Sequence, residues 1–348
     1  MTDGGGPDGG SNDPTTSIFY PKALFDLKNA LATAFNGKGD PATIPIAVIP
    51  NAVVPYWTAC QIGTGRAASE VGSPVSFQGP ASGKSSDQQA ILSALIASGY
   101  KGLSVSVLDP TTPATLQVLQ SATDKGIALV TIDSDAPMSS RLLYMGTDNY
   151  TAGLQAGQAM ATALGAGGGK VVGLVGYKDA QNAIDRISGI KAGMMGSTTS
   201  LVEVFYDNTD STLARSNVQD AMTKYPDLAG LIGIYSYNGP AAAGVVDAAG
   251  KAGAIKIVAF DLQSDTQAYL KSGVITAAIG QRPYMMGYLS VYVLRSVNGI
   301  GGPGTLSALQ PWLTGTNHDV IDTGIDVITS SSLGGYISFL QSLGIGSQ

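Results

Sequence analysis

The chain has 348 residues, of which 44% are apolar and only 13% are charged, and its formal net charge at pH 7 is −6. This length suggests two domains. The acidic balance argues against nucleic acid as a partner, because a phosphate backbone is bound by a basic surface. One cysteine cannot form an intrachain disulfide and one histidine cannot build a histidine-clustered metal site.

The two chain ends differ in composition from the rest. Residues 1–17 are almost wholly Gly, Asp, Ser, Thr, Pro and Asn, so we expect a disordered tether there. Residues 18–43 place Leu24, Leu27 and Leu31 at helical spacing and predict a helical extension. Residues 330–348 are expected to form a C-terminal tail. No run of eighteen apolar residues predicts a membrane span.

Between these ends, short apolar runs alternate with segments of helical period. The expected strands are Ile46–Ile49, Val75–Gln78, Gly102–Leu108, Ile127–Ile132, Leu142–Met145, Lys170–Val175, Leu201–Phe205, Leu228–Ile234, Ile255–Phe260 and Val274–Ile279. The expected helices are 56–70, 86–97, 114–124, 151–164, 183–195, 212–224, 240–249, 265–271 and 284–297. The alternation predicts an α/β fold with two doubly wound parallel sheets, and Gly299–Gly304 is expected to be a loop.

Motifs typical of catalysis are missing from the sequence. Gly167-Gly168-Gly169-Lys170 lacks the spacing of a phosphate loop, and no G-x-S-x-G elbow occurs. Asp133 and Asp135 form a D-x-D pair that is more typical of turns and caps than of a metal site. We therefore predict a protein that is not an enzyme and has no cofactor or metal. A sugar-processing enzyme that uses this Asp pair remains an alternative.

Planar polar side chains follow the ends of several expected strands, namely Asp109, Asp133, Asn238, Asp261 and Gln281. Ligands of parallel α/β sheets bind beyond the carboxyl ends of the strands, so we expect these side chains to converge on one site. Carboxylates and amides can hold adjacent hydroxyl groups, and the adjacent rings of Tyr56 and Trp57 can pack on the apolar face of a sugar. The set therefore predicts a neutral, polyhydroxylated ligand, although each residue taken singly also suits a turn, a cap or a packing role.

Several motifs resemble, in order, the periplasmic sugar-binding proteins of ABC transporters, ribose type. They are Pro55-Tyr56-Trp57, Val130-Thr131-Ile132-Asp133, Gly146-Thr147-Asp148-Asn149, Arg186-Ile187-Ser188-Gly189-Ile190, Asn238, Phe260-Asp261 and Gln281. The resemblance implies that Tyr56, Trp57, Asp109, Asp133, Ser134, Thr147, Arg186, Asn238, Phe260, Asp261 and Gln281 bind the ligand.

This sequence departs from the ribose binders at three of the matching positions. Ser134 stands where those proteins carry an arginine, and Asp109 where they carry an asparagine. Ile184 stands at a second arginine position, from which Arg186 is two residues away. Another monosaccharide or a sugar alcohol is therefore as compatible with this sequence as ribose.

The family resemblance also implies a domain organisation. Lobe 1 would comprise residues 44–146 and 282–315, and lobe 2 residues 148–280 and 319–329, joined by a three-segment hinge that closes on the ligand. The partners would be a small neutral sugar or polyol and an ABC permease, outside the cytoplasm and with a possible lipid anchor. Alternatives are a chemosensory or signalling receptor, which would use the same cleft, and a repressor ligand domain.

Overall fold

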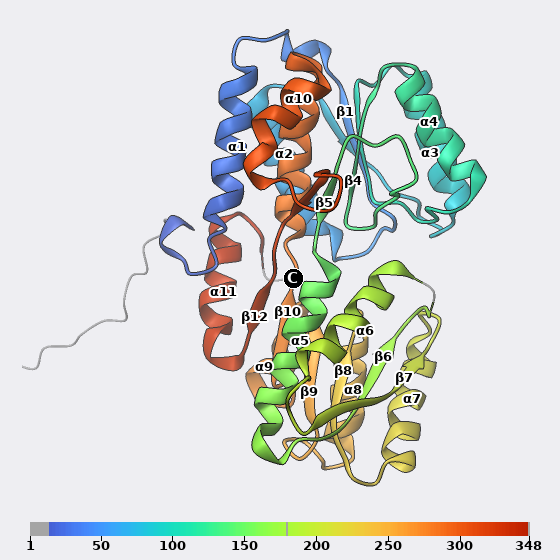
Figure 1. The fold of residues 1–348 in the computed structure, drawn as a ribbon, viewed down its shortest axis with the longest axis vertical. Helices are drawn as coiled ribbons and strands as arrows, with labels where there is room; N and C mark the ends of the chain where they lie inside the picture. The colour runs from blue at the N-terminus through green and yellow to red at the C-terminus, as the bar shows by residue number, and fades with distance from the viewer. Residues whose placement is uncertain (1–13, 179, 347–348) are drawn as a thin grey trace, which may run out of the picture.

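Two six-stranded sheets, each covered by helices on both faces, form two lobes along the long axis of the molecule (Figure 1). They are seen in a computed structural model that describes residues 14–178 and 180–346. The α/β prediction with two doubly wound sheets is confirmed. Residues 1–13 of the expected tether lie outside the described part of the chain, and residues 14–17 begin it with a 3₁₀ turn at Pro14–Thr16.

The first sheet has the order β11-β5-β4-β3-β1-β2 with all strands parallel. Its strands are β1 (Ile46–Ile49), β2 (Val75–Phe77), β3 (Gly102–Val105), β4 (Ala128–Ile132), β5 (Tyr144–Gly146) and β11 (Val320–Asp322). Helices α2 (Trp57–Val71) and α10 (Pro283–Leu309) cover one face, and α3 (Ser85–Ala97) and α4 (Pro113–Asp124) cover the other.

The second sheet repeats this order as β12-β10-β9-β8-β6-β7, with only β12 antiparallel to its neighbour. Its strands are β6 (Gly169–Val175), β7 (Thr199–Tyr206), β8 (Leu228–Gly233), β9 (Lys256–Phe260), β10 (Ala277–Gly280) and β12 (Asp326–Ile328). Helices α5 (Asn149–Leu164) and α6 (Gln181–Gly193) cover one face. Helices α7 (Ser211–Lys224), α8 (Asn238–Ala248) and α9 (Ser264–Ser272) cover the other.

Three sequence expectations are corrected. Residues 319–329 were expected in lobe 2, but β11 pairs with β5 in the first sheet and only β12 joins the second. Gly299–Gly304 lies inside α10 rather than in a loop, and Gly301, with φ 76°, marks the kink between two helical segments. The tail beyond residue 329 forms a helix, α11 (Ser330–Ser342), which a capping box at Thr329 begins.

Three crossovers join the lobes, and hydrogen bonds tie them to one another. Thr147 Oγ1 in the first crossover donates to Gln281 Oε1 in the second over 2.9 Å. The amide of Asp148 donates to Asp322 Oδ1 in the third over 3.0 Å. Arg282 bridges the second and third crossovers through an ion pair with Asp326 at 2.7 Å. The three crossovers are therefore bonded to one another and form a single hinge.

Helices α5 and α6 pack so closely that glycine is required at their contact. A Cβ atom at Gly153 would lie 2.1 Å from the carbonyl oxygen of Arg186, and one at Gly189 would lie 2.1 Å from that of Tyr150. Real Cβ atoms do not approach backbone this closely, so any side chain must push the helices apart. This packing fixes the backbone that carries Arg186.

The substitution Gly189→Ala should lower the free energy of unfolding by about 1–3 kcal/mol, because an overpacked helix contact forces backbone shifts. Thermal and denaturant unfolding would measure it. Gly334→Ala in α11 is the matched control, since its Cβ would meet nothing within 4 Å and alanine favours helix by up to about 1 kcal/mol. Equal stability of Gly189→Ala and the wild type would contradict the close-packing argument.

Candidate functional site

Asp133 and Asp261 occupy equivalent positions in the two lobes. Each directly follows the strand third in the order of its sheet, β4 or β9, and each has left-handed backbone, with φ 58° and 65°. Their amides donate to the next strand, to the carbonyls of Met145 at 3.2 Å and Ile279 at 2.9 Å. Aspartate tolerates this conformation better than most residues. The turn thus presents one carboxylate from each lobe at the carboxyl end of its sheet.

The first lobe holds the Asp133 side chain with two hydroxyl groups. Tyr56, just before α2, donates to Oδ1 over 2.9 Å, and Ser106, just after β3, donates to Oδ2 over 3.0 Å. The hydroxyl of Tyr144 donates to the Asp133 carbonyl oxygen over 3.0 Å. These bonds fix the carboxylate in one orientation.

Arg186, which is 4% exposed, is the centre of the second half of the site. Its Nε donates to Asn149 Oδ1 over 2.9 Å, its Nη1 to the Ile234 carbonyl over 2.9 Å, and its Nη2 to Gln281 Oε1 over 3.0 Å. Its guanidinium carbon lies 4.5 Å from the centre of the Phe260 ring. Packing and three hydrogen bonds therefore hold this charge in place.

Gln281 connects this arginine to Asp261 and to the hinge. Its Oε1 accepts from both Arg186 and Thr147, and its Nε2 donates to Asp261 Oδ1 over 2.9 Å. Asp261 and Gln281 are each 8% exposed. The amide thereby orients the carboxylate of lobe 2 from the second crossover.

Charges of the two lobes act on one another in this cluster. Burial raises the pKa of Asp133, while hydrogen bonds from Tyr56 and Ser106 and the charge of Arg186 oppose the rise. Burial raises the pKa of Asp261 to about 6, against the charge of Arg186 and the Gln281 hydrogen bond, and the charge of Asp133 adds to the rise. Gln281 thus links Arg186 to Asp261, the charge of Arg186 also acts on the half-buried Asp133, and the carboxylates keep spare acceptor capacity for hydroxyl donors.

The pKa of Asp261 implies a pH-dependent stability of the ligand-free protein. Its folded value of about 6 exceeds the unfolded value, so the native state holds the proton more tightly and ionisation costs stability as pH rises through about 4 to 6. Relative to Asp261→Asn, which cannot ionise, the wild type should be less stable at pH 7.5 than at pH 5 by about 1 kcal/mol. Unfolding of both proteins at the two pH values measures this difference, and an equal gap at both would contradict it.

Other predicted site residues have partners of their own. Trp57 is 3% exposed, lies in the core of lobe 1 and donates from Nε1 to Asn51 Oδ1 over 3.2 Å. Ser134 Oγ donates to the Val107 carbonyl over 2.8 Å. Asp109 directly precedes a turn at residues 110–111, and its carboxylate accepts from Thr111 Oγ1 at 3.5 Å. Within the described chain no hydrogen bond joins these three side chains to Arg186, Asp133 or Asp261, and their contact with a ligand stays a prediction.

Asn238 is fully buried and faces a residue that the sequence reading missed. Its Nδ2 donates to Asp207 Oδ2 over 2.7 Å, and its Oδ1 accepts from the Tyr235 amide over 3.0 Å. Asp207, 1% exposed, also accepts from the hydroxyl of Tyr237. Asp207 directly follows β7, so it has the same sequence signal as the other candidates, a polar residue at the carboxyl end of a strand.

Asn149, Ser106 and Tyr144 were also missed. Asn149 lies within the quoted Gly146–Asn149 motif, but its spacing gives no sign that it pairs with Arg186. Ser106 follows the polar Ser104 in an apolar run, a weak alternation signal. Tyr144 reads as an ordinary strand residue. Only the pairing of distant segments shows the contacts of all three.

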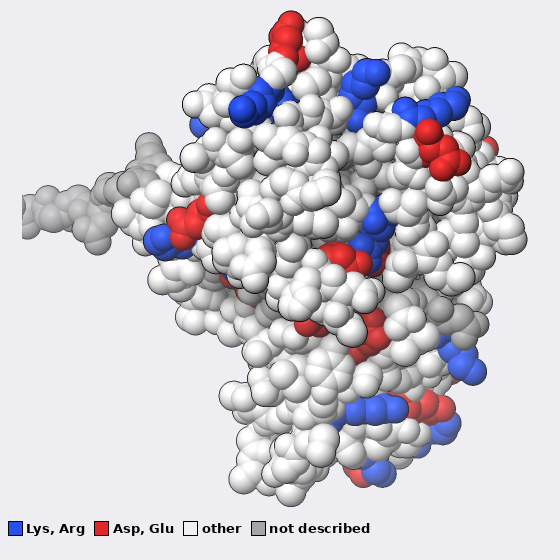
Figure 2. All heavy atoms as spheres, turned by 45° about the horizontal axis from the view of Figure 1, so that its top comes forward, with Lys and Arg blue, Asp and Glu red and all other residues white. Residues whose placement is uncertain are grey.

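Charged side chains are sparse and mixed in sign on the face shown in Figure 2. No broad basic surface is visible there, as expected for a chain with a net charge of −6.

Comparison with known proteins matches residues 46–300 to the model of a periplasmic binding protein domain. The chain belongs to the periplasmic binding protein family. It is therefore an extracytoplasmic protein of a family of binding proteins. No curated protein sequence matches it significantly. Among residues 14–178 and 180–346, no helix is both long and apolar enough to cross a membrane.

Solved structures of sugar-binding proteins share this fold. An ABC transporter solute-binding protein from Burkholderia graminis in complex with D-arabinose is 32% identical, with a TM-score of 0.71 over 85% of this chain and 98% of that one. A solute-binding protein from Agrobacterium vitis bound to α-D-tagatopyranose is 28% identical, with a TM-score of 0.72 over 83% and 96%. GanP, a glucose-galactose binding protein from Geobacillus stearothermophilus, is 27% identical, with a TM-score of 0.72 over 83% and 98%. The resemblance to sugar-binding proteins of ABC transporters is confirmed.

Proposed function

We propose that this periplasmic binding protein captures a neutral monosaccharide or sugar alcohol between its lobes and delivers it to an ABC permease. One observation carries the proposal: Gln281 of the hinge bonds both Asp261 and Arg186 of lobe 2, and Tyr56, which holds Asp133 of lobe 1, lines the same cavity as Asp261 and Gln281. The sugars bound by the similar solute-binding proteins support the same ligand class.

The chemistry of the cluster fits a hydroxyl-rich guest. Carboxylate oxygens accept from sugar hydroxyls, while the Arg186 and Gln281 nitrogens donate to them, and the Tyr56 ring offers an apolar face. The proposed ligand residues are Tyr56, Trp57, Asp109, Asp133, Ser134, Thr147, Arg186, Asn238, Phe260, Asp261 and Gln281. A ligand that touches both lobes stabilises their closed arrangement over an open one, which is the difference that closure requires.

A binding role without catalysis is part of this proposal. The two carboxylates are engaged by Tyr56, Ser106 and Gln281, and the family is one of binding proteins. We expect the sugar to leave chemically unaltered, and chromatography of the sugar after prolonged incubation would check this. A changed product would contradict the non-catalytic role.

The function can be tested by thermal shift followed by calorimetry. D-arabinose, D-ribose, D-tagatose, D-glucose, D-galactose and ribitol are the first candidates, with amino acids and sugar phosphates as controls. A ligand present at 100 times its Kd adds about 2.7 kcal/mol to the stability of the native state. We expect one or more neutral sugars to raise the melting temperature. Failure of every sugar and polyol, with a response to a charged solute instead, would contradict the proposal.

We also propose that residues 1–17 act as a spacer between the binding lobes and the membrane surface. The Gly, Asp and Ser composition supports it, because a segment with so few apolar side chains has little surface to bury in either lobe. Fractionation of the producing cell would test a lipid anchor: membrane-bound protein that detergent releases supports it, and wholly soluble protein contradicts it.

A further inference from the structure

The two chain ends cross the hinge in opposite directions. Helix α1 (Lys22–Phe35) packs on lobe 1 through Leu24, Leu27 and Leu31, yet Phe19, just before it, lies in the core of lobe 2. Helix α11 packs on lobe 2, yet Ile345, just after it, lies in the core of lobe 1. Each end therefore buries a side chain in the lobe to which its helix does not belong. In Figure 1, α1 and α11 lie on the same side of the crossovers.

Aromatic contacts connect these ends to each other. Phe19, 5% exposed, meets the Tyr336 ring of α11 edge-on with 5.2 Å between centroids. Tyr20 packs against the core of lobe 2 and stacks on Phe25 of α1 at 4.6 Å, and Phe25 in turn contacts Tyr288 of α10 at 5.9 Å. The neighbouring residues Phe19 and Tyr20 thus make ring contacts in two directions, Phe19 to α11 on lobe 2 and Tyr20, through Phe25, to α10 on lobe 1. Residues 19–35 and 330–345 are called the hinge clasp below.

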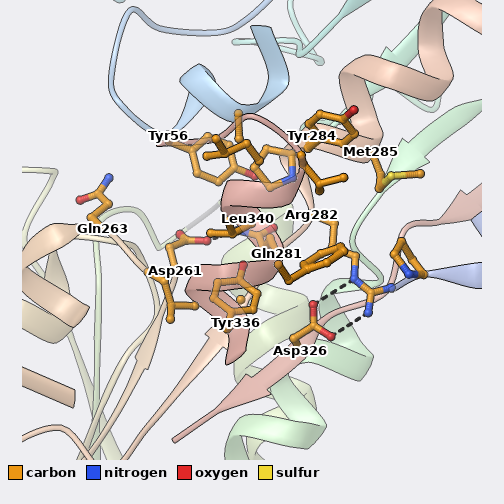
Figure 3. Close-up of a pocket in the computed structure, with 18 residues that line it drawn as sticks. Tyr56, Asp261, Gln263, Gln281, Arg282, Tyr284, Met285, Asp326, Tyr336 and Leu340 are labelled. Atoms are coloured by element: carbon orange, nitrogen blue, oxygen red, sulfur yellow. Dashed lines mark hydrogen bonds and ion pairs between the residues drawn. The ribbon is translucent and has the colours of Figure 1, made fainter. Parts of the chain in front are cut away.

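The clasp lies directly behind the candidate site. A cavity of about 60 Å³ separates Leu340, Leu343 and Ile345 from Asp261 and Gln281, with Tyr56 also in its wall. Figure 3 shows Tyr336 and Leu340 of α11 facing the labelled side chains of Asp261 and Gln281. Side chains of the clasp and of the site therefore line one cavity, so a movement of the lobes that changes its walls also changes the clasp contacts.

The clasp lies outside residues 46–300, the part of the chain that matches the family model, as β11 and β12 also do. Besides the three covalent crossovers, the lobes are joined by two packed connections, one at each end of the clasp. Those connections are formed in the arrangement in which Thr147, Gln281, Arg282 and Asp326 tie the crossovers together.

We propose that the hinge clasp restrains lobe opening and holds the ligand-free protein near the arrangement that binds ligand. Opening swings one lobe about the crossovers, and Phe19 and Ile345 then have to slide or leave the cores in which they are buried. Those contacts stabilise the arrangement seen here relative to an open one. The effect on affinity rests on the proposed function, whereas the restraint on opening does not.

The test is the double variant Phe19→Ala/Ile345→Ala, with Ile18→Ala as the matched control because Ile18 is 87% exposed. Small-angle scattering of the ligand-free proteins should give a larger radius of gyration for the double variant than for the wild type or the control. Affinity for the sugar found by thermal shift should fall about 3- to 10-fold, since a smaller fraction of molecules then has the binding arrangement.

Several outcomes decide the proposal. An unchanged radius of gyration in a folded double variant overturns it, even if the melting temperature falls, because the contacts then only stabilise the fold. If the double variant does not fold, deletion of residues 345–348 provides the same comparison at one end. If the wild type binds no sugar, the proposed function fails, but the scattering comparison still decides whether the clasp restrains opening.

Discussion

Asp261→Asn should reduce sugar affinity at least 100-fold while leaving the ligand-free protein as stable as the wild type or more stable. Hydrogen bonds to a charged partner contribute about 1.5–3 kcal/mol each, so loss of two such bonds to sugar hydroxyls has this effect. Asparagine keeps the shape, tolerates the backbone φ of 65° and can still accept from Gln281. The uncharged side chain also removes the desolvation and the repulsion from Asp133 that raise the pKa of Asp261.

Calorimetry with the sugar and thermal unfolding without it measure the two effects separately. Asp265→Asn, in the first turn of α9, is the matched control at an acidic position four residues away. A large loss of ligand-free stability in Asp261→Asn, with affinity retained, would show that this carboxylate maintains the turn and does not bind ligand.

Arg186→Met should lower the free energy of unfolding by about 3–5 kcal/mol and abolish detectable sugar binding. The side chain is 4% exposed, and its loss would leave Asn149 Oδ1 and the Ile234 carbonyl without their donor and remove one of the two donors to Gln281 Oε1. The charge that opposes the raised pKa values of Asp133 and Asp261 would vanish as well. Lysine would restore the charge but could not donate in the three directions of the guanidinium. The free energy of unfolding of Arg186→Lys should therefore lie between those of the wild type and Arg186→Met.

A double variant separates charge balance from packing. Arg186→Met could be destabilised mainly because it leaves the negative charges of Asp133 and Asp261 without a nearby positive charge. In that case the double variant Arg186→Met/Asp261→Asn should be more stable than Arg186→Met alone. Denaturant unfolding of the wild type, the two single variants and the double variant gives the coupling free energy between Arg186 and Asp261. A variant Arg186→Met with wild-type stability would refute the role of this arginine as the centre of the cluster.

Much of the fold could be predicted because its signals are local. A strand that is buried on both faces, such as β4 or β9, appears in the sequence as a short apolar run. A helix that packs on a sheet, such as α2, α6 or α8, appears as apolar residues at helical spacing. Both signals can be recognised within a short segment of the sequence. The predicted boundary between the lobes was wrong near the third crossover, where contacts between distant segments decide which sheet a strand joins. β11 and β12 are three residues each and too short for a pattern, and their places in different sheets depend on how the third crossover passes between the lobes.

The candidate site divides in the same way. Asp133, Asp261 and Gln281 were found because a polar residue after a buried strand is visible in the sequence. Tyr56 and Arg186 were also predicted as site residues, but their pairing was not, because Tyr56 and Asp133 are 77 positions apart and Arg186 and Gln281 are 95 apart. The fold brings distant segments together, and this decides which hydroxyl or amide group bonds to which charged side chain.

By itself, the sequence determined the fold class, the acidic net charge and the type of side chain at each strand end, since these follow from composition and short-range periodicity. The tertiary structure alone decided that Gln281 joins Arg186 to Asp261, that Trp57 is packed in a core, and that Phe19 and Ile345 are each buried in the lobe opposite to their own helix. The physical reason is that burial of a side chain against a remote partner leaves no periodic trace near that side chain in the sequence.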